Sequence, residues 1–149
     1  YQLILVSNQP GIAKNQFTAE THHQMVARLE ELLALEGVQL TAQYYCFHHP
    51  RAHHAEYRQE CGCRKPRSGL LRRAAEEHDV SLRDSITIGD GLTDVQAGKD
   101  AGTETILLTT LNSLTTRLMH ELDAEPGFIA RSLLESVEHV QLLQGRAVP

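Results

Sequence analysis

All three cysteines of the chain and four of its nine histidines fall within eighteen residues, which contain the patterns Cys46-x-His48 and Cys61-x-Cys63. Thiolate sulfur and imidazole nitrogen are ligands that Zn²⁺ prefers, and four of them close a tetrahedral structural site without an open position. An odd cysteine count, with two cysteines separated by a single glycine, argues against a disulfide framework. Three further histidines between residues 49 and 54 are alternative ligands, although the spacing favours His48. The pattern predicts a structural zinc site; buried cysteines with incidental histidines are the competing interpretation.

Two cations follow this cluster directly. Arg64 and Lys65 come straight after the last cysteine, so a bound metal would hold both at a fixed place. A second motif, Gly89-Asp90-Gly91-Leu92-Thr93-Asp94, lies between a strand-like and a helix-like segment. Mg²⁺ is commonly held by one or two carboxylates together with phosphate oxygens, so Asp90 is a candidate ligand and Asp94 a second one. These groups together predict phosphoryl-transfer chemistry. A turn aspartate, a helix-start aspartate and a surface lysine are the competing interpretation.

The composition is that of an ordinary globular domain. The 149 residues, 41% hydrophobic and 22% charged, are predicted to form one domain over residues 1–149. A net charge of −5 argues against nucleic acid or an anionic membrane as the main partner, because both attract basic surfaces. Basic residues gather between residues 58 and 73, which favours a small anionic substrate. Since no apolar run approaches ~20 residues and no signal-peptide pattern is present, the expected compartment is the cytoplasm.

Short apolar runs alternate with amphipathic segments along the chain. The runs predict strands at residues 3–6, 42–46, 85–88, 105–108 and 128–129. The amphipathic segments predict helices at residues 70–75, 93–101, 114–122 and 133–143. Another helix is predicted between an N-cap at Thr18 and a stop at Gly37, with a buried stripe of Met25, Leu29, Leu32 and Leu33.

This alternation predicts an α/β fold, a Rossmann-like, doubly wound parallel sheet. In such sheets the functional groups lie in loops at the carboxyl ends of the strands. Ser7, the cysteine–histidine loop and Asp90 all come at such ends in the sequence.

Four segments resemble a known family in their residues and their order: Val6–Ala13, Cys46–Pro50, Cys61–Pro66 and Ile88–Asp94. They are similar to the haloacid-dehalogenase-like (HAD-like) phosphatases, and within them to the group of heptose-bisphosphate and histidinol phosphatases. The interval of twelve residues between His48 and Cys61 looks more like the heptose enzymes. The resemblance therefore implies a HAD-like fold with a zinc-binding loop.

The resemblance also implies roles for particular residues. Ser7 would stabilise the transferring phosphoryl group, and Asn8 would help to form the phosphate pocket. Gln9 and Pro10 belong to the same substrate-binding loop. Lys65 would neutralise charge on the phosphoryl oxygens, and Arg64 would contact the second phosphate. Asp90 would bind Mg²⁺. The Zn²⁺ ligands would be Cys46, His48, Cys61 and Cys63.

The function implied by the resemblance is hydrolysis of a sugar phosphate. The first candidate is the C7 phosphate of D-glycero-D-manno-heptose 1,7-bisphosphate, a lipopolysaccharide precursor in carbohydrate metabolism, with catalytic Mg²⁺ and structural Zn²⁺. A histidinol-phosphate phosphatase and a non-catalytic, zinc-stabilised domain that binds phosphorylated ligands are the alternatives. The complete protein is expected to be a monomer.

The chain also departs from the family pattern. Family members open with an Asp-x-Asp-Gly motif at the end of a first, central strand, and its first aspartate is the nucleophile. Residues 1–6 contain no carboxylate. We therefore expect the nucleophile and the central strand to lie upstream of Tyr1, and this chain alone to be inactive. Pro10 stands where a serine is usual, and Gly91 where the heptose enzymes often carry a lysine that assists substrate binding.

Overall fold

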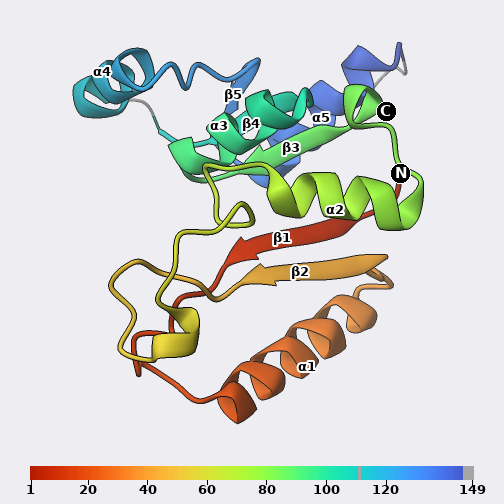
Figure 1. Ribbon diagram of the computed structural model, residues 1–149. Coiled ribbons are helices and arrows are strands. Elements are labelled where there is room, and N and C mark those ends of the chain that lie inside the picture. Colours follow the sequence, from red (N-terminus) through yellow and green to blue (C-terminus); the bar gives the residue numbers. More distant parts are fainter. Residues whose placement is uncertain (111, 146–149) are drawn as a thin grey trace.

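The computed structural model describes residues 1–110 and 112–145, in which strands and helices alternate (Figure 1). The strands are β1 Ile4–Asn8, β2 Ala42–Cys46, β3 Ile86–Gly89, β4 Glu104–Leu108 and β5 Phe128–Ala130. The helices are α1 Ala19–Leu35, α2 Gly69–His78, α3 Leu92–Ala101, α4 Ser113–Glu121 and α5 Leu133–Leu143, with 3₁₀ turns η1 Ala55–Tyr57 and η2 Leu82–Asp84. Every predicted strand and helix is present, and the α/β class is confirmed.

The strands form two separate parallel sheets. β1 pairs with β2 from Ile4 opposite Ala42 to Asn8 opposite Cys46. β4 pairs with β3 on one side and with β5 on the other, again in parallel. Among the described residues, no strand bridges β1 and β3. The sheet is thus interrupted between the strands that lead to Ser7 and to Asp90, as the resemblance implied.

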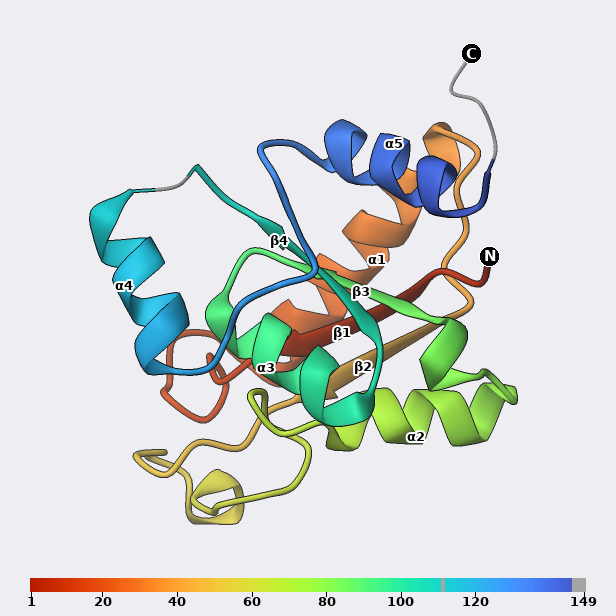
Figure 2. The ribbon, with the colours of Figure 1, turned by 90° about the horizontal axis from the view of Figure 1, so that it is seen from above.

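Helices cover both faces of the strands. Seen from above, α2 and α3 lie on one side, whereas α1 and α5 lie on the other (Figure 2). One core cluster joins α2 to β2 through Leu70, Ala74, Tyr44 and Cys46. A second joins α3, β4 and α4 through Val95, Leu107 and Met119. Fully burying a side chain of this size contributes roughly 1.5–3 kcal/mol, so each sheet is held by its own helices.

Helix α1 begins and ends where the sequence predicts, but its buried face differs. The Thr18 hydroxyl accepts a hydrogen bond from the N–H of Thr21 at 3.1 Å, and Gly37 follows the last turn with φ of 70°. Met25 and Leu32 are exposed, so the predicted stripe is wrong for these two residues. The inward positions are His22, Val26, Leu29 and Leu33. The buried face of α1 is rotated relative to the predicted one because the buried His22 ring packs edge-on against Tyr45 and Phe47.

No helix in the described ranges combines the length and the apolar character needed to cross a membrane.

Candidate active site

The carboxyl end of β1 is clamped to the loop that follows the cysteines. The Asn8 amide nitrogen donates to the Lys65 carbonyl at 3.0 Å, and the Lys65 N–H donates to the Asn8 amide oxygen at 3.0 Å. Two reciprocal hydrogen bonds fix both the distance and the orientation of two backbone segments 57 residues apart in the sequence. The backbone of Lys65 therefore has one position relative to β1, and Asn8 has a structural role beside its predicted one.

The side chain of Lys65 is buried at the same strand end. Its Nζ lies 2.5 Å from Oδ1 of Asp94 and donates to the carbonyl of Val6 at 2.9 Å. The two charged side chains are only 14% and 10% exposed, so water screens their attraction weakly. Lys65 and Asp94 thereby join β1, the cysteine loop and α3 at a single point. Neither the contact with Val6 nor the pairing with Asp94 was predicted from the sequence.

The position of the Asp94 side chain depends on two glycines, Gly91 and Gly89. Its second carboxylate oxygen accepts the N–H of Gly91 at 2.9 Å, which satisfies an otherwise free donor at the start of α3. A Cβ at Gly89 would lie 2.3 Å from the Asp94 Cβ, so only glycine permits this approach of helix to strand. Both oxygens of Asp94 are thus engaged by protein groups. Asp90, which directly follows β3, is exposed and faces solvent.

The other predicted substrate-binding residues surround this point. Ser7 is half-buried near the end of β1, and the N–H of Gln9 donates to the Cys46 carbonyl at 2.8 Å, which ties the following loop to β2. The Pro10 carbonyl accepts from Lys14 at 3.0 Å within that loop. Arg64 donates to the carbonyl of His48 at 3.0 Å, so its guanidinium lies against the cysteine–histidine loop rather than beside Lys65 Nζ.

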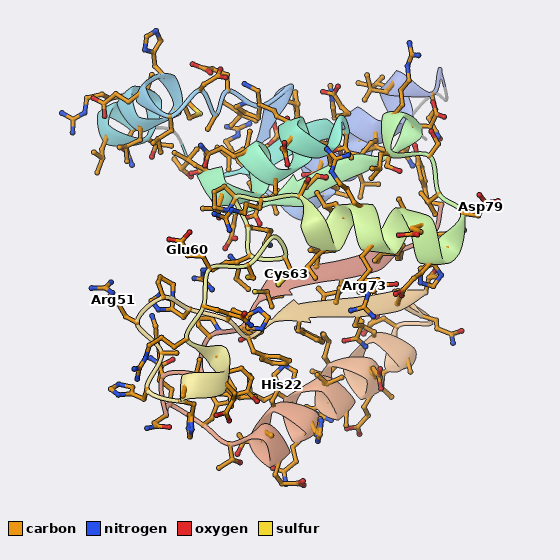
Figure 3. The ribbon with its side chains drawn as sticks, viewed as in Figure 1. His22, Arg51, Glu60, Cys63, Arg73 and Asp79 are labelled. Carbon is orange, nitrogen blue, oxygen red and sulfur yellow. The ribbon has the colours of Figure 1, made fainter. Side chains whose placement is uncertain are left out.

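Cys46, His48, Cys61 and Cys63 converge, as the spacing predicted. Their ligand atoms all lie within 4.8 Å of one another. The three Sγ–Sγ distances are 3.2, 3.3 and 3.6 Å, and His48 Nδ1 lies 3.3 Å from the Cys63 sulfur. Sulfurs about 2.3 Å from a tetrahedral Zn²⁺ would stand about 3.8 Å apart, so slight expansion would accommodate the ion. Figure 3 shows Cys63 beside the carboxyl ends of β1 and β2.

The electrostatics of the cluster favour a cation at its centre. Burial raises the pKa of the Cys46 thiol, and burial together with the neighbouring thiols raises the pKa of Cys63. Burial also pushes the pKa of Cys61 upward, but hydrogen bonds from Cys63 and Cys46 outweigh it and lower the pKa overall. Three thiolates cannot share so small a volume without positive charge. A soft donor set of three sulfurs and one imidazole suits Zn²⁺.

The loop between His48 and Cys61 is ordered by backbone contacts. The His49 and His53 N–H groups donate to the carbonyls of Tyr57 and Ala13 at 2.9 and 2.7 Å. Arg58 donates to the carbonyls of Ala52 and His53 at 2.7 and 3.1 Å. Because one of these contacts reaches Ala13, the cysteine loop is tied to the loop after β1. Arg51 at its tip extends into solvent (Figure 3).

Comparison with known proteins finds phosphatases that are similar to this chain. The model of the HAD-hydrolase-like family matches residues 62–136. A D-glycero-beta-D-manno-heptose-1,7-bisphosphate 7-phosphatase from Haemophilus ducreyi is 33% identical over 142 residues, which are 94% of this chain and 75% of the relative. The enzyme of the same name from Photorhabdus laumondii is 41% identical over 111 residues, 73% of this chain. The matched segment spans 59% of the Photorhabdus protein.

Solved structures that are similar to this chain also include phosphatases. The D,D-heptose 1,7-bisphosphate phosphatase from B. bronchiseptica, complexed with magnesium and phosphate, superposes with a TM-score of 0.79 at 31% identity. The match covers 97% of this chain and 75% of that one. An HAD-like phosphatase structure from Mesorhizobium loti follows with a TM-score of 0.69 at 28% identity, covering 83% of this chain and 65% of the other.

Proposed function

This chain belongs to the HAD-hydrolase-like family, and from that premise we propose that it is the main part of a Mg²⁺-dependent phosphatase for a sugar bisphosphate. The favoured substrate is D-glycero-D-manno-heptose 1,7-bisphosphate, cleaved at C7. The observation that carries the proposal is the buried Lys65–Asp94 pair, held against the carboxyl end of β1; the exposed Asp90 directly precedes Gly91, whose N–H donates to Asp94. A fixed cation and an exposed carboxylate at one edge of the strands are suited to a phosphoryl group and its metal ion.

We assign the roles as follows. The Ser7 hydroxyl and the Lys65 ammonium hold the phosphoryl oxygens and stabilise the charge that develops on them. Asp90 would bind Mg²⁺, which when bound supplies further neutralisation of that charge. Asp94 orients Lys65 because its two oxygens are engaged by Lys65 and Gly91. Direct Mg²⁺ ligation by Asp94 stays a prediction.

The covalent step needs a carboxylate that these residues do not offer. An aspartate would attack phosphorus, the sugar oxygen would leave with a proton, and water would then hydrolyse the acyl phosphate. Asp94 is engaged by Lys65, and an Asp90 that holds Mg²⁺ is a poor nucleophile. We therefore propose that the nucleophile comes from a segment upstream of Tyr1. The interruption between β1 and β3 leaves room for it beside Ser7 and Asp90.

The role we propose for Zn²⁺ is structural. Cys63 is two residues from Lys65, and Arg64 is bonded to the backbone of His48. A metal ion held by Cys46, His48, Cys61 and Cys63 would lock the end of β2 to the start of the Arg64–Lys65 segment. Because four protein ligands leave no open position, the ion would not take part in chemistry.

A substrate comparison tests the proposed function. The protein is expressed from its complete open reading frame, and phosphate release is measured on heptose 1,7-bisphosphate, heptose 1-phosphate and histidinol phosphate. We expect the bisphosphate to give the highest kcat/KM and heptose 1-phosphate to be the product that accumulates. A higher kcat/KM on histidinol phosphate would replace the heptose assignment. Phosphate binding without turnover on any substrate would favour the non-catalytic alternative.

A further inference from the structure

The residues that we propose to act together come from two halves of the chain that share no sheet. The first half, residues 1–80, carries Ser7 and Lys65, and the second half, from residue 81 onward, carries Asp90 and Asp94. Among the described residues, β1 and β3 are not paired, so no main-chain ladder sets the distance between the halves. Their relative position in this chain therefore depends on contacts outside the strands.

Hydrogen bonds and ion pairs join the two halves at two places in the part of the chain that the structure describes. One is the pair of Lys65 with Asp94. At the other, the N–H of Ser68 donates to a carboxylate oxygen of Asp100 at 3.3 Å, and the guanidinium of Arg72 donates to the Asp100 carbonyl at 2.5 Å. Asp94 lies in the first turn of α3 and Asp100 in its last turn, so the first half holds α3 at both of its ends.

The second of these contacts is an exchange of main-chain partners between two helix ends. The first N–H groups of a helix and its last carbonyls have no partner within that helix. The N–H of Ser68, at the start of α2, finds the carboxylate of Asp100. The carbonyl of Asp100, near the end of α3, finds the guanidinium of Arg72. We call Ser68, Arg72 and Asp100 the reciprocal cap, because each helix satisfies a main-chain group of the other.

The position of Asp100 suits α2 better than it suits its own helix. A carboxylate near the C-terminus of a helix faces the negative end of the helix dipole, whereas a carboxylate at an N-terminus is stabilised. The hydroxyl and the N–H of Ser68 hydrogen-bond the Asp100 carboxylate and lower its pKa. The same hydroxyl accepts from Nε of Arg72 at 2.8 Å. The charge of Asp100 is therefore engaged with the start of α2 rather than with α3.

The reciprocal cap is adjacent to the segment that carries Lys65. Ser68 follows Lys65 by three residues and is buried. The next N–H, that of Gly69, donates to the carbonyl of Gly62 in the cysteine loop at 3.0 Å. A Cβ at Gly69 would lie 2.3 Å from that carbonyl oxygen, so α2 starts in contact with the loop. Residues 63–68 are thus enclosed between the cysteine loop and α3, and a shift of α2 along α3 would displace Lys65.

We propose that the reciprocal cap positions the two halves of the site, so that Asp100 keeps the ammonium group of Lys65 in register with Asp90. Lys65 shortly precedes α2 and Asp90 shortly precedes α3, so the placement of one helix against the other sets the placement of the two groups. Asp100 lies at the end of α3 remote from Asp90, so it acts through Ser68 as a positioning residue. The kinetic part of this inference rests on the proposed function; the structural part does not.

Amide hydrogen exchange in the protein expressed from its complete open reading frame tests the structural part. Asp100→Ala removes the acceptor of the Ser68 N–H. We expect exchange to speed up at least about threefold at Ser68 and also at Lys65, whose N–H is bonded to Asn8, because the freed start of α2 loosens the segment before it. Faster exchange at Ser68 alone would show a purely local cap and overturn the positioning role.

One matched control and one second variant accompany this measurement. Lys99→Ala changes the adjacent residue of α3, but the Lys99 ammonium bonds Asp123 within the second half, so exchange at Lys65 should keep its wild-type rate. Arg72→Ala removes the other arm of the reciprocal cap from an exposed position on α2 and should speed exchange as Asp100→Ala does. Circular dichroism checks the folding of each variant. Unchanged exchange at Lys65 in both cap variants overturns the proposal, whatever the kinetics.

Steady-state kinetics on heptose 1,7-bisphosphate test the kinetic part. A displaced ammonium loses mainly transition-state stabilisation, so Asp100→Ala should lower kcat about tenfold and change KM by less than about twofold. Asp100→Asn keeps an oxygen that can accept the Ser68 N–H and should recover most of kcat, because asparagine caps a helix about as well as aspartate. Lys99→Ala should keep the wild-type kcat. An unchanged kcat in Asp100→Ala, or an equal loss in Asp100→Asn, would remove the positioning role.

The two measurements separate this inference from the proposed function. Absence of phosphate release by the wild type, together with faster exchange at Lys65 in Asp100→Ala, would keep the structural role of the reciprocal cap and count against the proposed function. Turnover by the wild type, with exchange and kcat both unchanged in Asp100→Ala, would keep the proposed function and overturn the inference.

Discussion

Lys65 is positioned from three directions at once. Asn8 fixes its backbone, while Val6 O and Asp94 hold its ammonium group. Taking a lysine out of water is costly unless its charge is compensated, and Asp94 supplies that compensation at 2.5 Å. In the role that we propose for it, this cation would stabilise a phosphoryl group without first reorganising, and such preorganisation is the main source of electrostatic stabilisation in active sites.

Removing the charge of Asp94 should therefore affect both stability and turnover. Asp94→Asn leaves a buried lysine unpaired, and breaking a buried pair in this way costs about 3–5 kcal/mol. Urea unfolding should report that loss, and kcat of the full-length protein should fall with it. The matched control is Asp123→Asn, which breaks an exposed pair with Lys99 and should cost under ~1 kcal/mol. Equal losses in the two variants would contradict the positioning role.

Arg64 and Lys65 should differ in kinetics although they are adjacent. Lys65→Ala removes a group that neutralises the transition state, so kcat should fall by about 10²–10³. Arg64 lies against the His48 carbonyl, outside the point where Lys65 and Asp94 meet. Contact with the second phosphate is similar in ground and transition states, so Arg64→Ala should raise KM for the bisphosphate and leave kcat nearly unchanged. A loss of kcat at constant KM would remove this role for Arg64.

At the scale of elements, the Zn²⁺ that we propose for the cysteine–histidine loop would couple metal binding to the site. Cys61→Ser removes one ligand, so it should lower the zinc content, the thermal stability and, through Lys65, the activity of the full-length protein. Elemental analysis, thermal melts and phosphate release measure the three effects together. The control is His53→Asn, since this exposed ring is outside the cluster, and it should keep one equivalent of zinc. Unchanged stability of the wild type after treatment with a strong chelator would contradict a structural metal.

The packing of α1 on β2 should respond to pH. Burial, assisted by His23, lowers the pKa of His22. The unfolded chain then binds a proton that the folded chain does not, in the window between the folded pKa and about 6.5, so stability falls as pH drops through it. His22→Leu should flatten the dependence of the unfolding free energy on pH between about 7.5 and 5.5. His120→Gln, at an exposed site on α4, should keep the wild-type slope.

Most strands and helices could be predicted because hydrophobic periodicity and helix capping depend only on short segments of the sequence. β2 and α5 were predicted with the observed bounds, and β4 was predicted to start one residue late. The convergence of the cysteines followed from their types and spacing, which are those of a four-ligand metal site. The Lys65–Asp94 pair was not predictable, because it depends on how close Gly89 lets α3 approach β3. The α1 stripe failed because a buried histidine with aromatic neighbours looks polar in a hydrophobicity pattern.

At the scale of the whole molecule, the gap in the sheet coincides with the place that we propose for the nucleophile. The two sheets separate between β1 and β3, and we propose that the nucleophile lies at the carboxyl end of that gap. Each sheet has its own core, so the strands that lead to Ser7 and to Asp90 are each held by their own helices. Exposed strand edges of this kind promote association, so the 149-residue chain should be less soluble than the longer protein.

Magnesium-dependent phosphate release from heptose 1,7-bisphosphate decides whether Asp90 and an upstream nucleophile form a phosphatase site, and three proteins are assayed side by side. We predict steady turnover by the protein expressed from its complete open reading frame. Its Asp90→Asn variant should lose about 10²–10³ in kcat. The 149-residue chain alone should remain at background because it lacks the nucleophile. Turnover by the 149-residue chain at the rate of the longer protein, or full activity in Asp90→Asn, would contradict the account.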